Sequence, residues 1–189
     1  MKQYGQVFKL NPDVADVSEK YATVYNNIAL LVLGGLEKGG TGCACPENTF
    51  IRALITDLVL YKNETLVIDM EAGVEHLGRA TVQGVDTLIL VLEPSSRSIS
   101  VGHRIIQMAT EIHLKSFKIV INKVKDPSDI EFVHQSFPDL EILGAIPFSE
   151  EIQNNERNKV AVLDNAPLPI VQAYTHIVEN LVKDQKSNN

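Results

Sequence analysis

Short apolar runs recur along the chain, and segments with a helical pattern separate them. Each run holds five or six residues and is rich in valine, isoleucine and leucine. A continuous apolar run of this length is typical of a strand that is covered on both faces in a parallel sheet. The predicted strands are 28–33, 65–69, 87–92, 117–122 and 141–146.

Four segments between and after these runs carry apolar residues at the 3.6-residue spacing of an amphipathic helix. They are 46–61, 98–113, 129–137 and 170–183. Pro46 suits a first helical position, and Ser98 is a predicted N-cap. Strands alternating with helices predict an α/β fold, a mostly parallel sheet with helices on both faces.

The length of 189 residues suits a single domain, so we expect one domain over 1–189. Residues 1–26 show few periodic apolar positions and are expected to form an extended lead-in. Residues 184–189 are expected to be a frayed tail.

The chain carries a net charge of -7, which argues against non-specific binding to nucleic acid, since that needs clustered lysine and arginine. No apolar run approaches the roughly 18 residues of a membrane-spanning helix. The first residues lack the apolar core of a secretion signal. We therefore expect a cytoplasmic location.

Cys43 and Cys45 lie one residue apart in a glycine-rich segment, close enough for both thiolates to reach one metal ion. Thiolates suit zinc and soft or borderline metals such as nickel or copper(I). The chain has no third cysteine, and its five histidines show no ligand spacing. A two-fold dimer completes a four-cysteine site, so the pair predicts a dimer as well as a metal. The alternative is two incidental cysteines in a flexible loop.

The segment Lys38-Gly-Gly-Thr-Gly42, which leads into these cysteines, is similar to a phosphate-binding loop. In such a loop a lysine and a serine or threonine follow, and these bind phosphate and Mg²⁺. Here Cys43 and Ala44 occupy those two positions. We therefore predict that the segment does not bind phosphate.

An acid closes the second apolar run, and a glycine follows four residues later: Asp69 and Gly73. This pattern is typical of nucleotide hydrolases, in which the acid acts on Mg²⁺ and the glycine amide contacts a γ-phosphate. The alternative is that Asp69 caps a loop.

Polar residues also follow the last three predicted strands. Arg97 follows the third and is a candidate for contact with an anion or a partner subunit. Asn122 and Lys123 close the fourth, where an asparagine amide reads a base edge in several nucleotide-binding folds. Pro147 follows the fifth, where backbone groups can complete a base pocket. Ligands bind at the carboxyl ends of strands in such sheets.

In these segments the chain resembles the carbon monoxide dehydrogenase maturation ATPases (CooC-like), within the MinD/ParA/nitrogenase iron protein group of P-loop NTPases. The most specific match is the cysteine segment. The matching segments are 8–12, 37–47, 69–79, 93–98, 122–123 and 144–147.

The resemblance implies an ATP-dependent dimer that assists nickel insertion into carbon monoxide dehydrogenase, its client. It implies ATP or ADP with Mg²⁺ as cofactor, and zinc or nickel between subunits at Cys43 and Cys45. It also implies that Asp69 is the Walker B acid, that Gly73 lies in switch II, and that Asn122 faces adenine.

The chain departs from this group in one respect, because no K-G-G-x-G-K-[ST] loop precedes Ile28. That loop supplies most phosphate hydrogen bonds. We therefore expect the chain alone to be inactive as an ATPase and to bind ATP weakly or not at all. It is then a truncated product, a gene fragment, or a split subunit completed by a P-loop-bearing polypeptide.

Three other functions stay open at this point. One is a non-hydrolysing metal-binding or scaffold subunit. Another is a MinD/ParA-type positioning ATPase, although no basic amphipathic C-terminal helix for a membrane is present. The third is a dimer bridged by an iron–sulfur cluster instead of a single metal ion.

Overall fold

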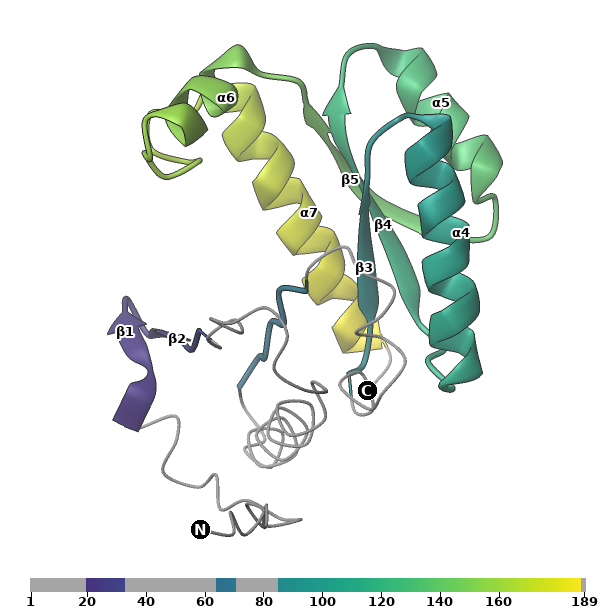
Figure 1. Cartoon of the computed structure of the whole chain (residues 1–189), viewed down its shortest axis with the longest axis horizontal. Coiled ribbons are helices and arrows are strands. Elements are labelled where there is room, and N and C mark those ends of the chain that lie inside the picture. Colours follow the sequence, from purple (N-terminus) through teal and green to yellow (C-terminus); the bar gives the residue numbers. More distant parts are fainter. Residues whose placement is uncertain (1–19, 33–63, 71–84, 188–189) are drawn as a thin grey trace, which may run out of the picture. The chain divides into compact units, whose positions relative to one another are not determined.

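A computed structural model describes residues 20–32, 64–70 and 85–187 (Figure 1). The chain divides into two units, Met1–Gly84 and Val85–Asn189, and each is considered by itself. The expected single domain therefore stays a prediction. The predicted helix 46–61 lies outside the described residues.

The second unit is built on a three-stranded sheet in the order β3-β4-β5. Its strands are β3 (Leu88–Leu92), β4 (Phe117–Val124) and β5 (Glu141–Pro147), and both pairs are parallel. Three of the five predicted strands are thus confirmed. β4 continues two residues beyond the predicted end at Asn122, and β5 continues one residue beyond Ile146.

Four helices accompany these strands: α4 (Ser96–Glu111), α5 (Pro127–Ser136), α6 (Glu150–Arg157) and α7 (Leu168–Ser187). The α/β class is confirmed, with α4 and α5 on one face of the sheet and α7 on the other (Figure 1). α6 was not predicted, because its sequence is almost entirely polar and shows no apolar stripe. α7 continues to Ser187, into the segment that was expected to fray.

The sheet has one apolar core on each face, because successive side chains of a strand point to opposite faces. Ile119 and Ile121 of β4 join the core beneath α4 and α5, and Val120 between them joins the core beneath α7. Leu143 and Ile170, both fully buried, connect β5 to α7 in the second core. These two cores explain why β4 and β5 are apolar on both faces, whereas β3 contributes only to the first core and its Val91 is 61% exposed.

The described part of the first unit contains a short antiparallel hairpin, β1 (Thr23–Tyr25) and β2 (Ile28–Leu30). Asn26 and Asn27 form its turn with φ values of 47° and 63°. Positive φ at both central residues is what a two-residue hairpin turn requires, and asparagine tolerates it. The lead-in expected over 1–26 therefore contains a strand.

Of the two strands predicted in the first unit, one is present only in part and is exposed, and the other is wrong. The run 28–33 was expected to be a strand covered on both faces, but β2 has three residues, all exposed, and pairs antiparallel. Residues 64–70 have no regular secondary structure, and Val67 is 83% exposed. An apolar run does not specify its pairing partner, and a strand forms only where a neighbour supplies the backbone hydrogen bonds.

Within the described ranges, no helix is long and apolar enough to cross a membrane.

Candidate functional site

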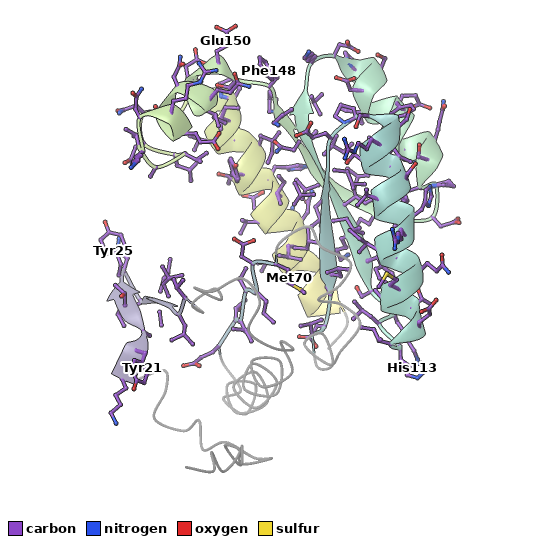
Figure 2. The ribbon with its side chains drawn as sticks, viewed as in Figure 1. Tyr21, Tyr25, Met70, His113, Phe148 and Glu150 are labelled. Atoms are coloured by element: carbon purple, nitrogen blue, oxygen red, sulfur yellow. The ribbon has the colours of Figure 1, made fainter. Side chains whose placement is uncertain are left out.

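The candidate site lies where the parallel strands β3, β4 and β5 end, at the same edge of the sheet. We call the residues there the strand-end cluster: Glu93, Asn122, Lys123, Pro147 and Phe148. Figure 2 labels Phe148 and the nearby Glu150 at this end of the sheet. The cluster joins the predicted residues of the fourth and fifth strands to two residues that were not predicted, Glu93 and Phe148.

Asn122 and Lys123 form a local turn at the end of β4. Lys123 has a φ of 58°, in the left-handed region that side chains other than glycine rarely adopt. Its backbone N–H donates to Oδ1 of Asn122 over 3.0 Å. The pairing of β4 with β5 is irregular between Ile121 and Val124, which accommodates this turn. The hydrogen bond fixes the direction of the half-buried Asn122 amide.

An ion pair connects the ends of β3 and β4. The ammonium of Lys123 contacts the carboxylate of Glu93, which directly follows β3. The side chains are 49% and 50% exposed, so water and salt screen their attraction and the ion pair alone stabilises the fold little. The ion pair instead affects local geometry, because it ties the ammonium of the left-handed Lys123 to Glu93, which follows the neighbouring strand β3.

The ends of β4 and β5 are joined by backbone and side-chain contacts. The N–H of Phe148 donates to the carbonyl of Val124 over 2.8 Å, beside the pairing of Val124 with Pro147. The ammonium of Lys125 lies 5.5 Å from the ring centroid of Phe148, within range of a cation–π attraction. Pro147 is thereby held within the same edge as Asn122.

The start of α4 corrects one prediction. Ser95 is the N-cap and accepts the N–H of Ser98 over 3.2 Å, so Ser98 is not the cap. Ser98 instead turns back and accepts the N–H of Glu93 over 3.1 Å. The two serines thus fix the loop that carries Glu93. Arg97, in the first turn of the helix, is exposed.

Two acids beside the strand ends accept hydrogen bonds at the starts of the following helices. The side-chain hydroxyl of Ser128, then its backbone N–H, hold the pKa of Asp126 below its ordinary value of 3.8, against a small opposing effect of burial. Asp126 is the N-cap of α5. A hydrogen bond from Ser149, the N-cap of α6, likewise lowers the pKa of Glu151. Both carboxylates are ionised at neutral pH.

Comparison with known proteins gives relatives of similar sequence. No family model matches the chain. An uncharacterized ATP-binding protein of Methanocaldococcus jannaschii is 38% identical over 156 residues, which is 81% of this chain and 60% of the relative. The carbon monoxide dehydrogenase accessory protein CooC of Rhodospirillum rubrum is 36% identical over 163 residues, which is 86% of this chain and 62% of the relative. The chain thus spans less than two thirds of the length of either.

Solved structures show the same fold. MinD of Aquifex aeolicus superposes with a TM-score of 0.62 over 72% of this chain and 61% of its own, at 18% identity. MinD of Pyrococcus furiosus superposes with a TM-score of 0.56 over 93% of this chain and 77% of its own, at 15% identity. The chain is CooC-like in sequence and shares the fold of MinD.

For this CooC-like chain, the structure brings together only part of the predicted site. Asn122, Lys123 and Pro147 lie at one edge of the sheet. Asp69 is described in the first unit, exposed and outside regular secondary structure. Cys43, Cys45 and Gly73 lie outside the described residues.

Among the residues that the structure does describe, no group of three or more histidine, cysteine, aspartate or glutamate side chains is placed to hold a metal ion. The metal assignment of this CooC-like chain therefore rests on the two cysteines.

Glu93 is one of the two residues of the cluster that sequence reasoning missed. An acid directly after an apolar run is a usable signal, and it was applied to Asp69 but not to Glu93. The ion pair with Lys123 joins residues 30 positions apart, which spacing along the chain does not reveal.

Proposed function

We propose that this chain acts in the ATP-dependent maturation of carbon monoxide dehydrogenase, assisting nickel insertion as the CooC-like resemblance implies. The observation that carries the proposal is the 36% identity to CooC of Rhodospirillum rubrum over 86% of this chain. That protein is described as a carbon monoxide dehydrogenase accessory protein. We take the same enzyme as the client of this chain, in the cytoplasm.

The nucleotide part of the proposal places adenine at the strand-end cluster. The Asn122 amide reads the base, and the backbone at Pro147 completes its pocket, because ligands of open α/β sheets bind beyond the carboxyl ends of the strands. Lys123 supports the same edge. Asp69 acts on Mg²⁺ and the Gly73 amide contacts the γ-phosphate of ATP. Relatives described as ATP-binding support this assignment.

The metal part of the proposal uses Cys43 and Cys45. Two thiolates supply half of a tetrahedral site, and the same pair from a second copy supplies the other half. The bound metal is zinc or nickel. The homodimer forms around it, and ATP hydrolysis needs a P-loop, which residues 1–189 do not contain.

The adenine assignment is tested by titrating Mg-ATP and Mg-ADP into the chain with calorimetry. We expect weak binding, and we expect Asn122→Ala to weaken it further, by about 2- to 10-fold, the worth of one hydrogen bond. Asn154→Ala, on the exposed side of α6, is the matched control. Equal effects of the two variants would remove Asn122 from the site. A micromolar affinity of the chain alone would contradict the need for a separate P-loop.

The maturation role is tested through the client. Carbon monoxide dehydrogenase is purified from cells that express or lack this chain, and its nickel content and CO oxidation are measured at limiting nickel. We expect the nickel content and the CO oxidation to be lower in cells that lack the chain. We expect the same in cells that express only a Cys43→Ser, Cys45→Ser variant. Unchanged nickel content in cells without the chain would refute the role. Unchanged content with the variant alone would leave a scaffold function that does not use the metal.

A further inference from the structure

Three residues in the strand-end cluster are connected in series. Glu93 contacts the ammonium of Lys123, and the backbone N–H of Lys123 donates to Oδ1 of Asn122 over 3.0 Å. Glu93 itself is held by the bond from its N–H to Ser98. The series begins after β3 and ends on the amide that is proposed to read the base.

We propose that Glu93 is a positioning residue that, through Lys123, orients the Asn122 amide and so favours adenine over guanine. The proposal rests on the function proposed above, because it specifies how that site selects its base. Lys123 then orients Asn122, in addition to lying beside the proposed base pocket.

The left-handed backbone of Lys123 is what needs support. A φ of 58° is unfavourable for a residue with a Cβ, and lysine relaxes to negative φ unless its surroundings hold it. The ion pair to Glu93 supplies that restraint from the neighbouring strand. Relaxation of Lys123 would turn its N–H away from Oδ1 of Asn122 and release the amide.

A fixed amide distinguishes the two purines. With Oδ1 held by the Lys123 N–H, the amide presents a second lone pair of Oδ1 beside the Nδ2 donor in a set order. Adenine offers a donor at N6 beside an acceptor at N7, which matches that order, whereas guanine offers acceptors at both O6 and N7. Release of the amide therefore weakens adenine binding more than guanine binding.

The test compares Glu93→Gln in two backgrounds, the natural chain and Lys123→Gly. Glycine adopts positive φ without support, so the Asn122 amide should stay oriented in the second background whether or not Glu93 is present. Glu179→Gln, at an exposed position of α7, controls for the lost charge. Lys159→Gly controls for the new glycine, because Lys159 is also left-handed, with a φ of 56°.

Two measurements are made on the full chain. Nuclear magnetic resonance without nucleotide follows the Asn122 side-chain amide signals and hydrogen exchange at residue 123. Calorimetry gives the ratio of Mg-ATP to Mg-GTP affinity. In the natural background we expect Glu93→Gln to shift the Asn122 signals, to speed exchange and to lower the ratio about threefold, the scale of an exposed ion pair. In the Lys123→Gly background and in both controls we expect no such change.

The contrary outcomes are distinct. Unchanged Asn122 signals and exchange in Glu93→Gln would overturn the positioning role whatever the nucleotide data show. Equal gains for ATP and GTP would indicate only a lost repulsion between Glu93 and phosphate, and would overturn the selection of adenine. A natural chain that binds neither nucleotide would overturn the base selection and the adenine assignment on which it rests, while the resonance data still decide whether Glu93 orients Asn122.

Discussion

Gly144 sets how closely α7 approaches β5. A Cβ added at this position would lie 2.6 Å from Cγ1 of Ile177, a buried side chain of α7. That distance is too short for two non-bonded carbons, so an alanine there must displace the Ile177 side chain or the helix that carries it. We expect Gly144→Ala to lower the free energy of unfolding by about 1–3 kcal/mol, as overpacked cores do.

A denaturant titration measures this effect, and a double-mutant cycle assigns its cause. Ile177→Ala removes the clashing atom and by itself costs about 2–5 kcal/mol. In the Ile177→Ala background Gly144→Ala should cost little, because its methyl group then has room. An undiminished cost in that background would mean that the glycine is needed for another reason.

Asp126 makes the stability depend on pH. Hydrogen bonds from Ser128 hold the pKa of its carboxyl below the ordinary 3.8, so the ionised form stabilises the folded state. This contribution is present above pH 3.8 and is lost as the pH falls through the lower folded value. Asparagine also caps helices but carries no charge.

We therefore expect Asp126→Asn to be less stable than the natural chain at pH 7, with the gap closing below pH 3.8. Thermal unfolding followed from pH 7 to pH 2.5 measures the gap. Asp139→Asn, in the turn after α5, should show no such gap at pH 7. If Asp126→Asn were still less stable than the natural chain at pH 2.5, the carboxylate charge would not be the source of the difference.

Sequence reasoning found those binding residues whose own residue type is informative and which stand directly at the end of an apolar run. Asn122 and Pro147 are polar or turn-forming residues directly at the end of a buried apolar run, and the structure places both at one edge. Glu93 and the left-handed φ of Lys123 escaped prediction. Both depend on contacts between strands, which apolar spacing does not encode.

At the scale of elements, the start of α4 is fixed by Ser95 and not by the predicted Ser98. Its Oγ accepts the N–H of Ser98, one of the helix donors that lack a partner within the helix. We expect Ser95→Ala to cost about 1 kcal/mol and to lower the melting temperature by about 2–4 °C. Ser96→Ala, at the first helical position, is the control. Equal losses from the two variants would mean that the cap adds nothing.

The strands that the apolar runs predicted correctly each contribute to a core. β4 and β5 contribute to both cores, and β3 contributes Leu90 and Leu92 to the first. The run 28–33 has the same appearance, but β2 is exposed and pairs within a hairpin whose turn, Asn26-Asn27, was the better signal. α6 is recognisable only by its Ser149 cap, since it has no buried residue.

At the scale of the whole molecule, different observations support the fold and the proposed metal site. The sheet of the second unit and its likeness to MinD establish the architecture. The proposed metal site depends on a second copy of the chain and on Cys43 and Cys45, which lie outside the described residues. Apolar runs alternating with helical patterns therefore predicted the fold, whereas the proposed metal site requires a measurement of assembly.

That measurement is the mass and metal content of the chain in solution. With zinc or nickel we expect a dimer holding about half a metal equivalent per chain, as a site of four thiolates requires. Structural zinc sites contribute about 10–16 kcal/mol, so removal of the metal by a chelator should return the protein to monomers. Acidification should do the same, because protonated thiols do not bind the metal.

A Cys43→Ser, Cys45→Ser variant should be monomeric and free of metal. Among the described residues, no group of three or more histidine, cysteine, aspartate or glutamate side chains is placed to hold a metal ion. Retention of half an equivalent of metal and of the dimer in this variant would refute the assignment. A visible absorption band in protein purified without oxygen would instead identify an iron–sulfur cluster, which thiolates also hold. The dimer prediction would survive that result, because a cluster that takes four cysteines still needs both copies.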